Sequence, residues 1–280
     1  MVTSSFDVLP LSPSIGAEIN GLDLTQPLSE ALLAELRSVW LERKVLLFRE
    51  QYLSIEQQVS FTQQFGELDK YPFLRGIGDN PYVAPVLKQP DETVNFGGVW
   101  HSDTTYLETP ALGATLSAVE VPPTGGDTIF VDMVAAYEAL SSGLKTTLAS
   151  LNAVNTSNKS VVSKTRVDRI ADHGDDSAPE VFTSIHPVIR RHPETRRQAL
   201  YVNEAHTTHF ENWTPLESKP LLDYLHQHQR RPEFQCRFCW SKGAIMLWDN
   251  RSTHHYPLND YHGHRRLMHR VSLKGDVPAR

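Results

Sequence analysis

The second half of the chain, from residue 112 onward, consists mainly of short apolar segments of strand length separated by turns. The first two, 112–121 and 126–131, flank the turn PPTGG. Short strands at such spacing are typical of antiparallel sandwiches and barrels. The other expected strands lie at 186–192, 198–203, 233–240, 244–250 and 267–273. We therefore expect a mainly β chain with flanking helices (α+β), built on one antiparallel sandwich or barrel.

Helices are expected outside the sheets. Ser29 can cap a helix whose apolar residues recur at helical spacing, and Ser54 with Gln57 forms a capping box before a second helix that stops at Gly66. The apolar run 45–48 between them is typical of a buried strand. The expected helices cover 30–44, 55–65, roughly 133–152, and a segment that begins after Thr214.

Two segments lack a helical or strand period. Residues 67–100 carry four prolines and four glycines and are expected to form a loop, a common location for binding residues. Residues 155–180 are polar and charged, and we expect a lid or a mobile insertion there. The chain of 280 residues is otherwise expected to form one domain over 1–280.

Bulk properties exclude several classes of protein. The formal net charge of −6 argues against a nucleic-acid partner, and no apolar run is long enough for a membrane span or a signal peptide, so a cytoplasmic location is expected. The two cysteines, Cys236 and Cys239, form a C-x-x-C pair. On a strand their thiols would point to opposite faces, so we do not expect them to share a metal.

The stretch VWHSDTTYLETP at 99–110 places His101 two residues before Asp103. On an extended backbone, side chains at i and i+2 project from the same face and can converge on one metal ion. The stretch WDNRSTHH at 248–255 offers a third ligand in His254 or His255, and strand geometry alone does not choose between them.

Two imidazoles and one carboxylate are the ligand set of non-haem iron(II) oxygenases, but zinc hydrolases use a similar set. The stretch RRLMHR helps to separate the two classes. On a strand, Arg266, Met268 and Arg270 would share one face, where the guanidinium groups could hold a small dicarboxylate. A metal-dependent hydrolase, the first alternative, would not need this anion. The second alternative is a binding protein with an inactive site, which would bind ligand without turnover.

The motifs WHSD, TGGDT at 124–128, WDNRSTHH and HGHRRLMHR at 262–270, together with PLSPSIGAEINGLDL near the start, resemble those of the taurine dioxygenase (TauD/TfdA) family. The resemblance covers nearly the whole chain. It implies a double-stranded β-helix, or jelly roll, and an enzyme that uses Fe(II), 2-oxoglutarate and O2.

The resemblance also implies roles for individual residues. His255 rather than His254 would complete the iron site with His101 and Asp103. Thr128 and Arg266 match the positions that hold the distal carboxylate of 2-oxoglutarate, and Arg270 matches an arginine beside the substrate's sulfonate.

The substrate positions depart from taurine dioxygenase. Tyr71 stands in place of a histidine, Gly97 in place of an asparagine, and His206 in place of a phenylalanine. The resemblance therefore implies hydroxylation of a small anionic molecule, with aldehyde and sulfite released if it is a sulfonate. The alternative is hydroxylation or desaturation of a carboxylic acid or a natural-product intermediate. Members of the family are commonly oligomeric, so a homo-oligomer is expected.

Overall fold

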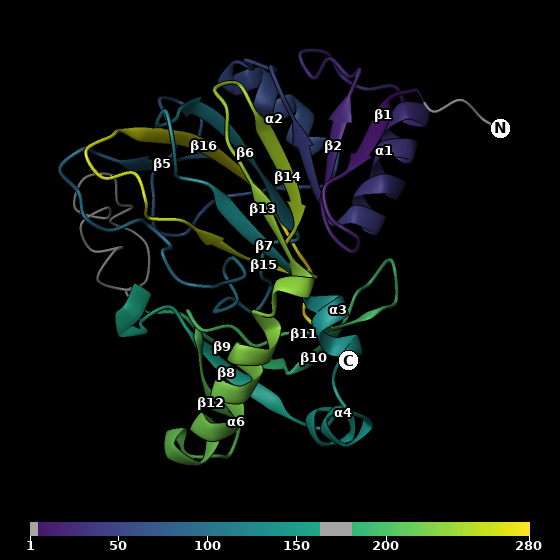
Figure 1. The fold of residues 1–280 in the computed structure, drawn as a ribbon, viewed down its shortest axis with the longest axis vertical. Coiled ribbons are helices and arrows are strands. Elements are labelled where there is room, and N and C mark those ends of the chain that lie inside the picture. The colour runs from purple at the N-terminus through teal and green to yellow at the C-terminus, as the bar shows by residue number, and fades with distance from the viewer. Residues whose placement is uncertain (1–4, 163–180) are drawn as a thin grey trace.

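The computed structural model describes residues 5–162 and 181–280, and two β-sheets that pack face to face form its centre (Figure 1). Of the expected lid or insertion at 155–180, residues 163–180 lie outside the described residues. The larger, eight-stranded sheet has the order β1 (Asp7–Pro10), β2 (Ala17–Asn20), β3 (Val45–Phe48), β14 (Ile245–Asp249), β6 (Gly113–Glu120), β16 (Arg266–Leu273) and β4 (Leu68–Asp69), with β5 (Val83–Lys88) also paired to β16.

The smaller sheet that faces it has three antiparallel strands, β13 (Gln235–Phe238), β7 (Thr128–Asp132) and β15 (Thr253–Pro257). One hydrophobic cluster joins the two sheets: Phe130 and Phe238 of the smaller sheet pack with Met246, Trp248 and Met268 of the larger one. Alternate residues of each strand point into this layer. The expected sandwich with helices outside is therefore confirmed.

The opposite face of the larger sheet is covered by two helices, α1 (Glu30–Arg43) and α2 (Ile55–Gln63) (Figure 1). Leu46 and Phe48 of β3 point to this side and pack with Trp40 of α1 and Phe61 of α2. Ser54 forms the expected capping box with Gln57. Both predicted helices are thus present, and they pack against the face of the larger sheet that points away from the smaller sheet.

A further layer lies below the sandwich in Figure 1 and packs around its own hydrophobic cluster. It contains β8 (Asn152–Thr156), β9 (Thr183–Pro187), β10 (Ile189–Arg191), β11 (Gln198–Leu200), β12 (Thr207–Phe210), α3 (Met133–Glu138), α4 (Ser142–Leu148), α6 (Pro215–Gln229) and a short 3-10 helix over Pro232–Phe234. The single helix expected over 133–152 is wrong. The chain forms two helices there because Ser141 caps a new one, accepting from Leu144 N.

The expectation of a loop over 67–100 is wrong in part, because β4 and β5 lie within it. Pro85 made a strand hard to predict, since proline cannot donate a backbone hydrogen bond. It is tolerated because β5 pairs only with β16 among the described strands and leaves its other edge unpaired.

The two cysteines lie as expected for a strand. Cys236 is buried between the sheets, and burial raises the pKa of its thiol to about 11. Cys239 is exposed and points away. Within the described ranges, no helix is long and apolar enough to cross a membrane.

Candidate metal centre and cavity

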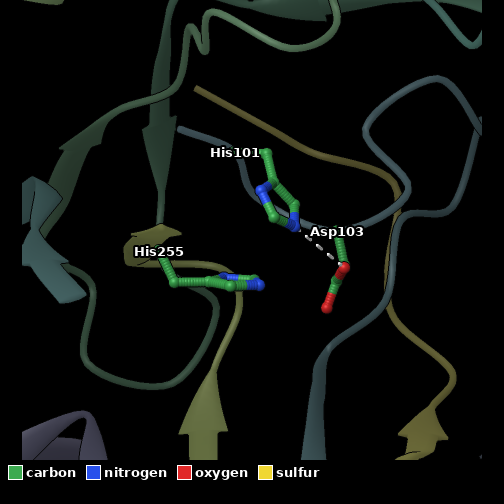
Figure 2. A group of neighbouring side chains, drawn as sticks. All are labelled: His101, Asp103 and His255. Atoms are coloured by element: carbon green, nitrogen blue, oxygen red, sulfur yellow. Dashed lines mark ion pairs between the residues drawn. The ribbon is translucent and has the colours of Figure 1, made fainter. Parts of the chain in front are cut away.

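His101, Asp103 and His255 point toward one another from two distant parts of the chain (Figure 2). Each offers one ligand atom, and these three atoms lie within 4.8 Å of one another. His101 Nε2 lies 3.7 Å from Asp103 Oδ1. No other group of three histidine, cysteine, aspartate or glutamate residues comes together in this way in the part of the chain that the structure describes. The structure thus brings together the three expected ligands.

Asp103 is held by a side chain that sequence reasoning missed. Asn250 Oδ1 accepts from the Asp103 main-chain nitrogen at 2.8 Å, and Asn250 Nδ2 donates to the Asp103 carbonyl at 3.0 Å. Ser102 Oγ donates to the Asn250 carbonyl at 2.8 Å. A regular strand does not continue past His101; Thr104 has a φ of 54°. The two ligands therefore converge through this turn and its asparagine, and not through the strand alternation that the sequence suggested.

The two histidines are placed by backbone pairing and ring packing. His255 lies on β15 and forms an isolated antiparallel bridge with His101, with ring centroids 4.1 Å apart. Its ring stacks on Phe130 at 5.3 Å, with Trp248 at 5.4 Å. The neighbouring His254 occupies the opposite side of β15 and is fully buried. The geometry selects His255 for the site.

The electrostatics suit a divalent metal ion. Burial lowers the pKa of His101 and holds that of His255 well below its usual value, so both rings are neutral and can act as ligands. The Nδ1 of His101 bonds the Val99 carbonyl at 2.6 Å, which leaves Nε2 free to face the site. Burial would raise the pKa of Asp103, but the positive charge of Arg270 outweighs it and holds this pKa below its usual value.

Two buried polar atoms of this group have no hydrogen bond, His255 Nδ1 and one oxygen of Asp103. Asp103 Oδ1 pairs with Arg270 Nη1 at 3.1 Å, whereas the second oxygen, Oδ2, is buried and has no hydrogen bond. A buried carboxylate oxygen without a partner is costly. Two neutral imidazoles and this free oxygen fit a first-row divalent metal with open positions.

The expected cofactor residues line the same cavity, which lies between the two sheets. Arg266 and Arg270 share the inner face of β16 with Met268, as predicted, and both arginines are buried. Arg266 Nε and Nη2 have no hydrogen bond. Thr128 of β7 accepts from Trp240 Nε1 at 3.0 Å, and the same indole ring lies 5.8 Å from the Arg266 guanidinium carbon. Trp240, unnoticed in the sequence, therefore links Thr128 to Arg266.

The expected substrate residues also line this cavity. The Arg270 guanidinium carbon lies 4.3 Å from the centre of the Tyr71 ring. His206 packs edge-on against Tyr106 at 4.9 Å. Gly97 has a φ of 70°, and a Cβ placed there would lie 3.2 Å from His101 Cε1. Glycine at this position keeps the approach to the metal-facing edge of His101 open.

Comparisons with known proteins show similarity over nearly the whole chain. Residues 7–272 match the model of the family described as taurine catabolism dioxygenase TauD, TfdA family. The chain is 30% identical to an alpha-ketoglutarate-dependent sulfate ester dioxygenase of Pseudomonas putida, over 98% of this chain and 91% of the relative. It is 32% identical to an (S)-phenoxypropionate/alpha-ketoglutarate-dioxygenase of Sphingobium herbicidovorans, over 98% and 97%.

Among solved structures, the chain resembles a putative alpha-ketoglutarate-dependent taurine dioxygenase from Burkholderia xenovorans, with a TM-score of 0.84 and 37% identity. The similarity covers 98% of this chain and 94% of that one. This confirms the expected double-stranded β-helix for the two packed sheets.

Proposed function

The chain belongs to the TauD/TfdA family of 2-oxoglutarate-dependent dioxygenases, and from that premise we propose that it binds Fe(II) at His101, Asp103 and His255 and hydroxylates a small anionic organic molecule. The observation that carries the proposal is that the buried triad lines one cavity with two buried arginines, Arg266 and Arg270, which share one face of β16. When bound, Fe(II) and 2-oxoglutarate supply an oxidative decarboxylation that consumes O2 and yields succinate, CO2 and hydroxylated product.

The two arginines divide the cavity into two anion-binding ends. They lie four positions apart on the strand, roughly 13 Å along the backbone. Arg266 and Thr128 would hold the distal carboxylate of 2-oxoglutarate, because the Trp240 N–H occupies a lone pair of the Thr128 oxygen and leaves its hydrogen available for donation. Arg270 would hold the substrate anion through its unpartnered Nε.

Arg270 also connects the substrate to the metal site. Its Nη1 already pairs with Asp103 Oδ1, so one guanidinium would contact both the substrate anion and a ligand carboxylate. Phe130 and Trp248 pack against His255 and exclude water from that side of the triad.

The substrate proposal is a small anion with an apolar body, of the alkylsulfonate or sulfate-ester type. Tyr71, Phe96, Tyr106 and His206 line the cavity on the Arg270 side and supply aromatic surface. The relatives named above act on sulfate esters and phenoxypropionate. A sulfonate hydroxylated at the carbon that bears sulfur would collapse to an aldehyde and sulfite. The alternative substrate is a carboxylic acid or a natural-product intermediate, hydroxylated or desaturated at the same site.

The test is anaerobic addition of Fe(II) and 2-oxoglutarate to the purified protein, with visible absorption followed for the weak charge-transfer band of the chelate. Oxygen is then admitted and succinate is measured. A band followed by oxygen-dependent succinate supports the oxygenase and provides an assay for screening sulfonates, sulfate esters and carboxylates. Bound iron with neither signal would favour a hydrolase or a binding protein.

A further inference from the structure

Two buried cations lie side by side at one end of the cavity. In the antiparallel register of β5 and β16, Lys88 is directly opposite Arg266. Directly opposed residues of an antiparallel pair point to the same face, with Cβ atoms about 4.5–5.5 Å apart. The two side chains are only 3% and 4% exposed, and both line the cavity.

Among the described residues, neither cation forms an ion pair, although the negative charges of Glu92 and Asp127 act on Lys88 and Arg266, respectively, from a greater distance. Within residues 5–162 and 181–280, no ion pair includes Lys88 or Arg266. Lys88 Nζ donates to Asn259 Oδ1 at 2.9 Å and lies 4.2 Å from the centre of the Tyr261 ring. These contacts orient the ammonium group, but they bring no negative charge.

This arrangement is unfavourable unless an anion binds. Like charges directly opposite each other destabilise an antiparallel pair. A buried cation without a counter-charge loses its hydration and gains no ion pair in return. By contrast, Arg270, four positions further along β16, lies opposite the small residue Ala84 and already pairs with Asp103. The excess positive charge is therefore concentrated at the Arg266 end.

We infer that Lys88 is a third residue of the site for the distal carboxylate of the co-substrate, joining Arg266 and Thr128. The inference rests on the proposed function, because it takes 2-oxoglutarate as the ligand of that end. A carboxylate has about four lone-pair sites, enough to accept from a guanidinium, a hydroxyl and an ammonium group at once. Two cations at this end select a dicarboxylate over a 2-oxo acid without the second carboxylate.

The experiment compares two ligands on the protein loaded with Mn(II), which avoids turnover. N-Oxalylglycine carries both the metal-chelating group and a distal carboxylate, whereas oxamate carries the chelating group alone. Their dissociation constants are measured by titration calorimetry for the unmodified protein, Lys88→Met and Lys88→Arg. We expect Lys88→Met to weaken N-oxalylglycine binding at least about tenfold, the loss of one charged hydrogen bond. Oxamate binding should be unchanged, and Lys88→Arg should retain most of the affinity for N-oxalylglycine.

Lys88→Gln provides the same test should the methionine variant misfold, because glutamine removes the charge and retains a donor for Asn259. The melting temperature without ligand adds a separate readout. A lysine that serves the ligand should leave this temperature unchanged or raised on substitution, since a repulsion is removed, whereas a lysine that serves only the fold should lower it.

The possible results separate the two proposals. Binding of N-oxalylglycine retained in both neutral variants, or equal loss of both ligands, overturns the role of Lys88 and leaves the dioxygenase proposal intact. Failure of the unmodified protein to bind N-oxalylglycine with Mn(II) bound overturns the co-substrate site itself, and the role of Lys88 with it.

Discussion

The main chains of His101 and His255 hydrogen-bond to each other in both directions, from His101 N to His255 O at 3.1 Å and from His255 N to His101 O at 2.8 Å. These two hydrogen bonds connect the turn that carries Asp103 to strand β15. It also fixes the register of β15, so that His255 faces the site and His254 faces away.

The first prediction concerns these adjacent histidines. His255→Ala should abolish Fe(II) binding because it removes one of three ligands, whereas His254→Ala should leave binding largely intact. The measurement is anaerobic metal titration of both variants, with circular dichroism to establish that each is folded. Equal loss of iron from both would contradict the assignment of His255.

The second prediction concerns Gly97. Gly97→Ala should lower metal affinity, because the new Cβ would crowd His101 at 3.2 Å. Because alanine is strained at this positive φ, the substitution should also lower the free energy of unfolding by about 1–2 kcal/mol. Gly263→Ala is the matched control: its φ is 79°, but a Cβ there meets nothing within 4 Å. Both variants should lose similar stability by denaturant unfolding, and only Gly97→Ala should also bind metal more weakly. A similar change in metal affinity in both would show that crowding of His101 is not the cause.

The third prediction concerns Trp240. Trp240→Phe keeps an aromatic ring beside Arg266 but removes the N–H that Thr128 accepts. The Thr128 hydroxyl would then be free to rotate, so the KM for 2-oxoglutarate should rise by about three- to tenfold, the equivalent of one neutral hydrogen bond. The KM for the second substrate should change little. A variant with unaltered KM for 2-oxoglutarate would exclude this orienting role.

The fourth prediction concerns acid stability. Burial lowers the pKa of His254 to about 3 and that of His226 to about 4. The unfolded chain, with pKa values near 6.5, takes up these protons first, so stability is retained above pH 6.5 and lost as the pH falls toward 4. Each group should cost about 2 kcal/mol of unfolding free energy between pH 8 and pH 5.

Urea unfolding at several pH values between 8 and 5 measures this loss. His254→Ala should show a smaller loss than the unmodified protein, since the contribution of His254 is absent. A flat stability profile between pH 8 and 5 would mean that these histidines are not held in the neutral form.

The sequence predicts the inner face of β16 because it depends on short-range spacing. The triad is predicted for another reason, the resemblance to family motifs, since His101 and Asp103 converge through a turn held by the distant Asn250. The alternation of Arg266, Met268 and Arg270 is a property of any strand. It does not predict Asn250 or Lys88, whose roles depend on partners far along the chain. Asn250 bonds Asp103 across 147 residues, and Lys88 meets Arg266 only through the pairing of β5 with β16. Because Pro85 argues against a strand, the sequence predicts neither β5 nor the position of Lys88 opposite Arg266.

Strand β16 also limits how the length of this chain can vary. A single residue inserted between Arg266 and Arg270 would turn one of the two arginines away from the cavity and toward α2, because side chains alternate along a strand. The segments that carry Tyr71 and Gly97 lie outside regular strands and can gain or lose residues without shifting that register. Loops that lengthen or shorten can therefore reshape this part of the cavity, while the triad and the two arginines of β16 stay in place.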